Sequence, residues 1–461
     1  MGRFSEFSNF QKLLFKKGES RLLCIQFDII CYISHFMNVQ RNNRMKRQMS
    51  ETAEYELAVR CNSFEKLEEL ILRDDEKLYE KHDFAISNSD TNKILKMTNL
   101  SLIHIAAFFD SFECFLVLEK IGGLSPQLKS VESVHPIQYA CYGNSLEVVS
   151  YILLKYPQEA KIATPIQYSL YFCCASSCYK DDRIINLLRK YGTPYPNCIT
   201  DQHYSPVYKS ITLKNDVTLK ALLNVKKLSS KEQKDFSPLM TAIIYKEYEA
   251  IDILLNSGED AGFFLPNGKC ALYCACFINH HTSDGSDSQI ELIERLLRLT
   301  ETINIEPNIP NIAGPIHWIC RSSSPNIARL FFKYHPEIDV NRVDENNFTG
   351  PVILAFLREI SSNDIIEIIS LCLKHGYNLN TYNRQNRQKS LIEVFCFAIT
   401  VQPLVVQFLL DNGASPYVPF IGNGYINVQK EATVFMKITA NKKGPVYEIM
   451  MEYAKRNPPP M

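Results

Sequence analysis

The amino-acid sequence predicts an all-α fold, a solenoid of stacked helix-turn-helix units with short hairpin loops. Segments that share one order of residue types recur along the chain, and each is followed by a second apolar run with helical spacing. Glycine often closes that second run, as at Gly258, Gly376 and Gly413. Hydrophobic residues make up 46% of the 461 residues, which is enough apolar material for an ordered core.

Each recurring segment predicts the first helix of a unit. It opens with a small or capping residue, usually followed by Pro, an aliphatic residue, two variable positions and a small residue. Ser or Thr at an N-cap accepts a hydrogen bond from an otherwise unpaired backbone N–H, and Pro at the first helical position loses no hydrogen bond. Segments of this kind begin at His135, Thr164, Ser205, Ser237, Cys270 and Gly314.

The aliphatic residue of each segment defines the repeat length. Several successive intervals are 32 to 34 residues, and longer intervals locate insertions, most clearly the polar run His280–Ser288 between the two helices of its unit. A divergent first unit contains Tyr55, and Glu80–Met97 is predicted to be a polar connection after it. The aliphatic positions are Ile103, Ile137, Ile166, Val207, Leu239, Leu272, Ile316, Val352, Leu391 and Val434.

These segments resemble the ankyrin repeat, whose signature Thr-Pro-Leu-His-x-Ala recurs with a period near 33 residues. His104 and His317 stand at the position of the signature His. The run Asp-Asn-Gly-Ala-Ser-Pro at 411–416 resembles the end of the family's second helix. The chain most resembles the divergent ankyrin-repeat proteins of protists. At the signature His, other units carry Gln138, Gln167, Tyr208, Met240 and Tyr273.

The resemblance implies a domain organisation. Residues 1–51 form an N-terminal extension, residues 52–455 form about ten to eleven divergent repeats, and residues 456–461 form a C-terminal tail. Repeat boundaries stay open within 164–205, 270–315 and 389–440. A different solenoid of helical hairpins is the alternative architecture.

Charge and cysteine content restrict the environment and the partners. Lys plus Arg and Asp plus Glu both total 50, so the whole chain offers no electrostatic reason to bind nucleic acid. Nor does a basic stripe recur with the repeat, so no nucleic acid is expected as a partner. Many of the 15 cysteines fall in helical patterns beside Ala and Leu, and the chain starts with no recognisable signal sequence. We expect a reducing, cytoplasmic environment.

The N-terminal extension is the basic part of the chain. Residues 1–48 contain nine Lys or Arg and three acidic residues. The apolar stretch Leu22–Val39 is short for a membrane span and contains Asp28, so a buried or amphipathic helix is favoured. Membrane contact is expected only through residues 1–48, where basic residues beside an apolar stretch suit anionic lipid. An alternative is that Met49 is the natural start.

A solenoid of this kind suggests a protein–protein interaction scaffold that binds a protein or peptide on its concave face. The resemblance implies that two positions at the end of each first helix face that surface. The alternative for each of these residues is a place in the core. Carried onto this chain, the partner-binding residues are Phe108, Phe109, Tyr142, Tyr171, Phe172, Ile244, Tyr245, Phe277 and Ile278.

Other conspicuous residues are expected to be structural. Trp318 occupies a position that faces inward in the family, so we expect it in the core. His104 and His317 are expected to bond to turn backbone. The loop-tip residues form a second candidate surface, with solvated turn chemistry as the alternative. They are Asn267, Lys269, Asn311, Asn346 and Arg384.

No catalytic machinery is apparent, and we expect neither an enzyme nor a cofactor. The sequence contains no Walker A, dinucleotide-binding, HExxH, GxSxG or kinase signature. A zinc site or a cryptic enzyme is the less favoured alternative. Its strongest motif is Cys270, Cys274 and Cys276 followed by His280 and His281. These cysteines fall at cap and small-residue positions and lack zinc-finger spacing, so packing is the favoured explanation and no metal is expected.

Overall fold

The computed structural model describes most of the chain after the N-terminal extension. Apart from the side chains at 46–52 and 84–98, it covers residues 46–88, 93–162, 168–196, 205–226, 237–277, 287–302, 304–383, 385–398, 401–421, 432–440 and 443–459. The apolar stretch Leu22–Val39 therefore lies outside the described residues, as do Ile278, His280, His281 and Arg384.

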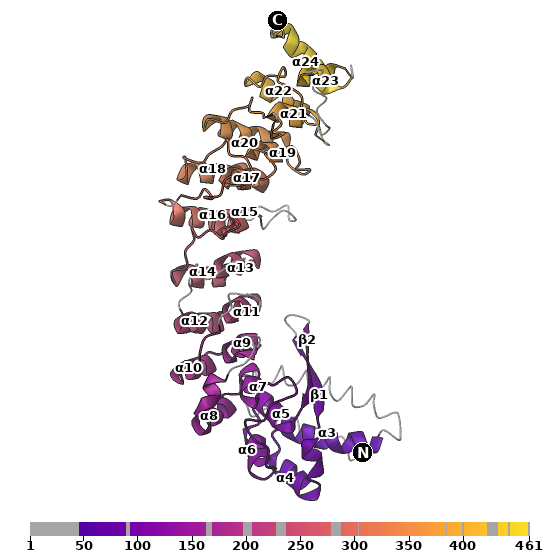
Figure 1. Ribbon diagram of the computed structural model, residues 1–461, viewed down its shortest axis with the longest axis vertical. Helices are drawn as coiled ribbons and strands as arrows, with labels where there is room; N and C mark the ends of the chain where they lie inside the picture. The colour runs from indigo at the N-terminus through magenta and orange to yellow at the C-terminus, as the bar shows by residue number, and fades with distance from the viewer. Residues whose placement is uncertain are drawn as a thin grey trace. The chain divides into compact units, whose positions relative to one another are not determined.

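The described residues form consecutive helix pairs, which confirms the predicted all-α repeat fold (Figure 1). The chain divides into unit 1, residues 1–227, and unit 2, residues 228–461. In unit 1 the pairs are α3 (Lys46–Arg60) with α4 (Phe64–Arg73), α5 (Leu102–Phe109) with α6 (Phe112–Lys120), α7 (Pro136–Tyr142) with α8 (Leu146–Lys155), α9 (Leu170–Ser176) with α10 (Arg183–Lys190), and α11 (Pro206–Thr212) with α12 (Asp216–Val225). The short 3₁₀ helices are η1 (Glu76–Tyr79) and η2 (Pro157–Lys161).

Unit 2 continues the pattern with longer connections. Its pairs are α13 (Pro238–Ile244) with α14 (Tyr248–Asn256), α15 (Ala271–Phe277) with α16 (Asp287–Thr300), α17 (Pro315–Ser322) with α18 (Pro325–Tyr334), α19 (Gly350–Leu354) with α20 (Ser362–Lys374), α21 (Leu391–Cys396) with α22 (Pro403–Asp411), and α23 (Val434–Thr439) with α24 (Pro445–Arg456). Helix α15 ends at Phe277 and α16 begins at Asp287, so the last two residues of the predicted insertion His280–Ser288 belong to α16, and the rest of it lies outside the described residues.

Local capping explains where the first helices begin. The Ser205 hydroxyl accepts a hydrogen bond from the Tyr208 N–H at 3.5 Å, and the Ser237 hydroxyl accepts one from the Met240 N–H at 3.1 Å. In both helices Pro follows the cap, where its missing N–H costs nothing. The capped Pro openings predicted at Ser205 and Ser237 are therefore the true starts of α11 and α13.

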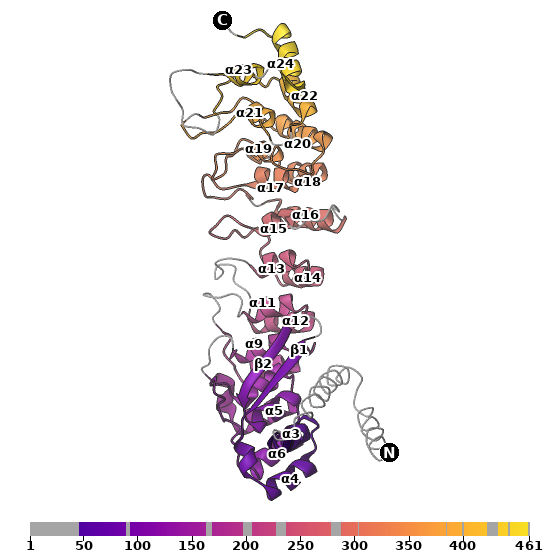
Figure 2. The same cartoon turned by 90° about the vertical axis from the view of Figure 1, so that its right-hand side faces the viewer.

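Stacking of the first helices forms the core of each unit. In unit 1, α5 contacts α7, α7 contacts α9 and α9 contacts α11; in unit 2 the contacts run from α13 through α15, α17, α19 and α21 to α23. In Figure 2 the loops that join successive pairs of unit 2 extend on the side of α17, α19 and α21. Each first helix thus lies between its own second helix and the first helices of the neighbouring pairs.

The segment between the first two helix pairs is a correction to the sequence analysis. The predicted polar connection Glu80–Met97 contains the strand β1 (His82–Asn88) and most of its antiparallel partner β2 (Lys93–Leu100). Phe84 and Ile86 stand two residues apart and a polar run follows them, which is a hairpin signal that the helical periodicity obscured.

The fourth helix pair is a second correction, because its first helix starts later than predicted. Ser169, not Thr164, caps α9, and its hydroxyl accepts a hydrogen bond from the Phe172 N–H at 3.3 Å. Tyr171 therefore takes the second helical position that the sequence assigns to Ile166. The intervals become 34 residues from Ile137 to Tyr171 and 36 from Tyr171 to Val207.

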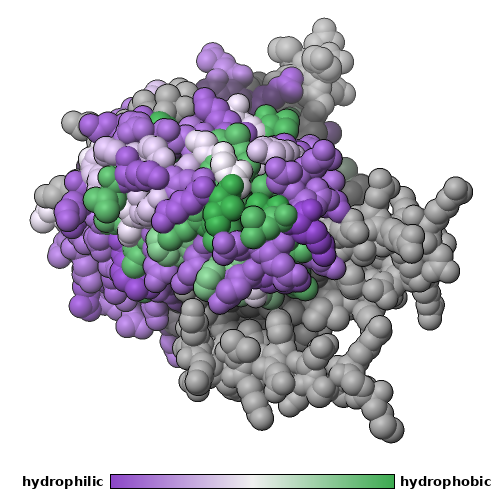
Figure 3. All heavy atoms as spheres, turned by 90° about the horizontal axis from the view of Figure 1, so that it is seen from below, coloured by the Kyte–Doolittle hydropathy of each residue, from purple (hydrophilic) through white to green (hydrophobic). Residues whose placement is uncertain are grey.

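The outer face of the first helix pair exposes apolar side chains. Figure 3 shows apolar surface surrounded by hydrophilic surface at the end of the chain that carries α4 and α6. In this pair Leu57, Phe64 and Leu72 are 42%, 38% and 77% exposed. End pairs of repeat arrays usually present a polar outer face, so this end departs from the usual pattern. Among the described helices, none combines the length and hydropathy that crossing a bilayer requires.

Candidate partner-binding surface

A common register relates the ends of the first helices. Counting from the residue after the N-cap, position 7 lies at or just beyond the end of each first helix in unit 2. Because these helices stack on one another, their position-7 side chains form a series along unit 2. We call this series the helix-end row and include the adjacent Tyr245. Its members are Ile244, Tyr245, Phe277, Arg321, Phe356 and Phe397.

Most of the helix-end row is exposed. The exposed fractions are 44% for Ile244, 47% for Tyr245, 54% for Phe356 and 46% for Phe397. Phe277 is half-buried and Arg321 is exposed. Large apolar side chains are usually buried. Three that recur at one register and stay exposed, together with the adjacent Tyr245, are the kind of surface that marks an interaction site.

The rings of the row are held by neighbouring side chains. Phe277 stacks on Tyr273 with centroids 4.2 Å apart, and the Arg321 guanidinium lies 5.1 Å from the Phe277 centroid. Phe356 lies 5.8 Å from Phe348. These contacts restrict the rings while leaving part of each accessible, which lowers the entropy cost of binding.

Phe397 has a similar support on the next pair. Its ring lies 5.0 Å from the ring of Phe420, and the Lys437 ammonium lies 5.5 Å from the Phe420 centroid. Aromatic and cationic groups therefore alternate at this end of the row as they do at Phe277 and Arg321. Cations over aromatic faces add a modest attraction.

The predicted binding residues of unit 1 are less accessible. Phe108, Phe109 and Tyr142 are each half-buried. Phe108 and Phe109 pack edge to face at 5.2 Å, and the Arg60 guanidinium lies 5.1 Å from the Phe109 ring. Burial raises the pKa of the Tyr142 hydroxyl well above its ordinary value.

Tyr171 and Phe172 lie in the core and not at the end of a first helix, where the sequence analysis placed them. Their exposed fractions are 0% and 7%. Because α9 starts at Leu170, they occupy helical positions 2 and 3, which face the neighbouring helices, and not the helix end. Ser176 stands at position 7 of this helix.

Phe356, Phe397 and Arg321 are members of the row that the sequence analysis missed. Thr349 is the N-cap of α19, so Val352 is at position 3 rather than position 2, and Phe356 is at position 7. Ser390 caps α21 through a hydrogen bond from the Glu393 N–H, which puts Phe397 at position 7. Counting from each cap, instead of from the aliphatic residue, would have found both.

The predicted structural roles of the signature histidines are confirmed. In His104 the Nε2 atom lies 2.9 Å from the Leu128 carbonyl and Nδ1 lies 2.7 Å from the Ser101 hydroxyl. In His317 the Nε2 atom lies 2.9 Å from the Phe348 carbonyl. Both imidazoles thus hold the backbone of the loop that enters the next pair.

Gln138 and Glu393 perform the same role at the same position. The Gln138 side chain accepts a hydrogen bond from the His135 N–H at 2.6 Å and donates one to the Tyr168 carbonyl. One Glu393 carboxylate oxygen accepts a hydrogen bond from the Ile421 N–H at 3.0 Å. A polar side chain of the right reach can therefore replace histidine at position 3.

Trp318 is in the core as predicted, with no exposed surface. Its ring meets Tyr273 edge to face at 6.1 Å and lies 6.4 Å from Phe264. Because Tyr273 also stacks on Phe277, the buried Trp318 contacts the side chain that holds the Phe277 ring of the helix-end row.

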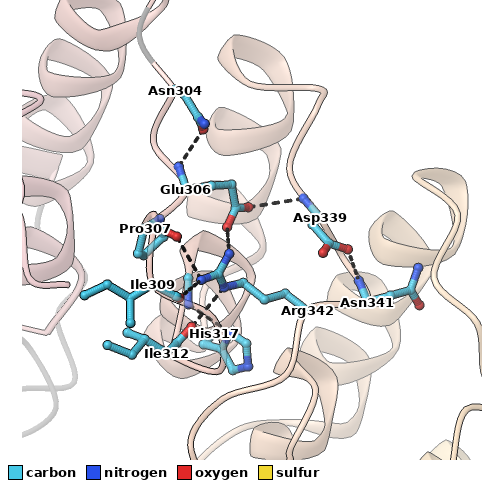
Figure 4. A network of polar contacts seen from close by, with 10 residues as sticks. Asn304, Glu306, Pro307, Ile309, Ile312, His317, Asp339, Asn341 and Arg342 are labelled. Atoms are coloured by element: carbon cyan, nitrogen blue, oxygen red, sulfur yellow. Dashed lines mark hydrogen bonds and ion pairs between the residues drawn. The ribbon is translucent and has the colours of Figure 1, made fainter. Parts of the chain in front are cut away.

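A half-buried ion pair joins two of the connecting loops (Figure 4). Arg342 donates hydrogen bonds to the Glu306 carboxylate at 3.1 Å and to the carbonyls of Ile312 and Ile309 at 2.9 and 2.6 Å. The other Glu306 oxygen accepts from the Asp339 N–H at 3.2 Å. Burial raises the pKa of Glu306 despite the nearby guanidinium. This network positions the loops that precede α17 and α19.

The loop-tip residues show turn chemistry. The Asn267 side-chain oxygen accepts a hydrogen bond from the Lys269 N–H at 3.1 Å, and the Asn346 N–H donates to Asp344 at 2.8 Å. Asn311 has a positive φ of 57°, which Asn tolerates in turns. These contacts support a role in shaping the loops.

The cysteines of the proposed zinc motif are buried. Cys270, Cys274 and Cys276 are each 2–3% exposed. Burial raises the thiol pKa of Cys270 and of Cys274 to about 12, which disfavours the thiolate that zinc needs. Within the described residues no group of three or more His, Cys, Asp or Glu side chains is placed to hold a metal ion.

Comparison with known proteins adds little beyond the fold. No family model matches the chain, and no curated protein matches it. Among solved structures, the crystal structure of the human ASB11 ankyrin repeat domain is similar to 69% of this chain and 100% of that chain. The sequence identity is 17% and the TM-score is 0.29, too low to support an argument about function.

Proposed function

We propose that the chain is an interaction scaffold that binds another protein through the helix-end row of unit 2. The observation that carries this proposal is the recurrence of exposed apolar side chains at one register. Four side chains of the row are 44–54% exposed, whereas many other large apolar side chains are buried in the core: Ile244, Tyr245, Phe356 and Phe397. Aromatic anchors of this kind dominate the energetics of many interfaces.

The mechanism is apolar complementarity on a preorganised surface. A partner segment lying along the row would bury these rings one after another, each about one helix spacing from the next. Ring contacts with Tyr273, Phe348 and Phe420 hold the row in place before binding. Phe108, Phe109 and Tyr142 of unit 1 are retained as weaker candidates because they are half-buried.

Nothing in the described residues favours catalysis, and we propose a non-enzymatic protein. The polar side chains singled out by the sequence, His104 and His317, are engaged by loop backbone. Apart from Cys178, the described cysteines are free thiols, most of them buried, which supports a reducing, cytoplasmic location. Membrane tethering through residues 1–48 remains a proposal from the sequence alone.

The test is selection of binding peptides from a random displayed library against the full chain. The selected peptides are then measured with the triple variant Tyr245→Ser, Phe356→Ser, Phe397→Ser. We expect affinity to fall at least about tenfold, since each lost anchor costs on the order of 1 kcal/mol or more.

A matched control removes three apolar side chains from the second helices. Tyr248, Leu299 and Leu404 are 44%, 50% and 64% exposed and lie on α14, α16 and α22. Their triple Ser variant should bind the selected peptides as the unchanged chain does. Equal affinity for both triple variants, each with unchanged helical content, would rule out the helix-end row as the binding surface.

A further inference from the structure

We propose that the segment bound by the helix-end row is an acidic peptide that carries apolar side chains. This inference rests on the proposed function and specifies the partner of the same surface. The argument starts from the charges that flank the exposed rings, because these decide which peptides are attracted and which are repelled.

Exposed cations without carboxylate partners accompany the row. Arg321 is itself a member, Arg358 follows Phe356 by two residues, and Lys437 lies over the ring that supports Phe397. All three side chains are exposed, and no described carboxylate forms an ion pair with any of them. Their charge is available to a ligand.

Several carboxylates of unit 2 pair with cations of the second helices. Asp252 pairs with Arg295, and Glu367 pairs with Arg329. In the same layer Glu294 pairs with Arg298 at 2.9 Å. These cations are compensated by carboxylates, whereas the three cations beside the row form no ion pair with a described carboxylate.

The basic character of the row is not a consequence of composition. Unit 2 contains 21 Lys or Arg and 25 Asp or Glu, a net charge of −4. The carboxylates nearest the row in sequence are Glu247, two residues after Tyr245, and Glu359, three residues after Phe356; Glu247 is half-buried and Glu359 is exposed. Three cations without described carboxylate partners, placed along a row of rings on an otherwise acidic unit, complement Asp and Glu.

Ring and cation lie close enough for one peptide to use both. The Arg321 guanidinium is 5.1 Å from the Phe277 centroid, and the Lys437 ammonium is 5.5 Å from that of Phe420. An apolar side chain on a ring therefore places a neighbouring carboxylate within reach of the adjacent cation. The apolar contact supplies affinity, and the charge supplies selectivity and a faster encounter.

Basic and aromatic side chains together also suit single-stranded nucleic acid. The net charge of −4 on unit 2 opposes a polyanion over longer distances. A short acidic peptide places its few charges at the patch and avoids most of that repulsion. We therefore assign the row to an acidic peptide and make RNA an outcome of the test.

The experiment measures fluorescence anisotropy of the full chain with three labelled peptides that share the same Leu and Phe anchors. The residues between the anchors are Glu in the first, Gln in the second and Lys in the third; labelled oligo(U) is the fourth probe. We expect the Glu peptide to bind about tenfold more tightly than the Gln peptide at low salt, and the Lys peptide to bind weakest. The advantage of the Glu peptide should shrink as salt is raised.

A charge-reversal pair assigns the effect to the row. Arg321→Glu with Arg358→Glu should abolish the preference for the Glu peptide and transfer it to the Lys peptide. The control is Lys374→Glu with Lys455→Glu, two exposed lysines on the second helices with the same change in net charge. The control should keep the preference for the Glu peptide.

The outcomes separate this inference from the proposed function. If the Glu and Gln peptides bind equally, and both are lost in the Tyr245→Ser, Phe356→Ser, Phe397→Ser variant, the row binds peptides and the acidic assignment is wrong. Tighter binding of oligo(U) than of the Glu peptide also overturns it. If the ring variant binds every peptide unchanged, the proposed function fails as well.

Discussion

Position 3 of the first helices shows how different side chains can perform one structural task. His104, Gln138, His317 and Glu393 each hold the backbone of the loop that enters the next helix pair. Burial favours the neutral imidazole, in which Nε2–H donates to the Leu128 carbonyl and Nδ1 can accept from the Ser101 hydroxyl. Protonation would reverse the direction of the contact with Ser101 and place a charge in a buried site.

This geometry predicts a pH-dependent contribution of His104 to stability. Burial lowers the pKa of His104 from 6.5 to about 4, against smaller opposing effects of backbone hydrogen bonds. Because the unfolded chain binds the proton more readily, this contribution is complete above pH 6.5 and is lost as the pH falls toward 4. Between pH 7.5 and pH 5 the loss should be about 2 kcal/mol.

His104→Gln should remove that part of the pH dependence, because Gln138 already fills the same position in the next helix pair. The amide can bridge the cap and the loop without titrating, as Gln138 does. Urea unfolding at pH 7.5 and pH 5 measures the free energies of both proteins. Identical slopes with pH for the two would show that His104 does not carry the effect.

Trp318 should make a far larger contribution to stability than the exposed Phe356. Trp318 has no exposed surface, whereas Phe356 is 54% exposed. Trp318→Ala leaves a large cavity and should cost about 3–5 kcal/mol. Phe356→Ala should cost less than about 1 kcal/mol. Denaturant unfolding checks both, and similar costs would place Phe356 in the core and remove it from the binding surface.

The packing distance between neighbouring first helices depends on small residues at their ends. A Cβ on Gly143, at the end of α7, would come within 1.7 Å of the Phe108 carbonyl oxygen at the end of α5. The φ of Gly143 is −77°, so the requirement for glycine comes from this close approach and not from the backbone conformation.

We therefore expect Gly143→Ala to force α5 and α7 apart. The cost should be about 2 kcal/mol or more, as for other overpacked sites. The control is Gly123→Ala, where a Cβ meets nothing within 4 Å but φ is +66°, so only backbone strain is added. Thermal unfolding of the two variants compares them. If Gly143→Ala destabilises the protein less than Gly123→Ala does, α5 and α7 separate at little cost in free energy.

The sequence predicts the first residue of a helix most accurately where only one candidate N-cap lies near that helix. At α9 the Thr-Pro pair at 164–165 imitates a start, but Ser169 provides the real cap. The two sites are five residues apart, and their local chemistry is similar. Only packing of α9 between α7 and α11 distinguishes them, because it requires Tyr171 on the buried face.

At the scale of the whole molecule, each unit is a series of helix pairs that contact their neighbours. Stability of such arrays is close to a sum of pair and interface contributions, so damage is expected to stay local. Trp318→Ala should therefore increase hydrogen exchange in α15 to α20 more than in α5 to α8. Exchange mass spectrometry measures this by segment. A uniform increase across the chain would indicate one cooperative unit instead.

Features that depend on contacts within one helix turn could be predicted from the sequence alone. Ser237 and Ser205 cap helices, Pro follows them, and the spacing of apolar residues predicts the second helices, because these effects act over three or four residues. The core position of Trp318 and the backbone contacts of His104 and His317 were also predictable from repeat position.

Which apolar residues are exposed depends on tertiary packing and could not be predicted from the sequence. Tyr171 and Phe397 are both aromatic residues near a first helix, yet one is fully buried and the other is 46% exposed. Tyr171 is the second residue after its N-cap, Ser169, and neighbouring helices cover it. Phe397 is the seventh residue after its N-cap, Ser390, and lies at the helix end. The alignment of Arg321, Arg358 and Lys437 along the row also depends on stacking. These residues belong to α17, to the loop after α19 and to α23, and only the contacts between successive pairs bring these elements into one series.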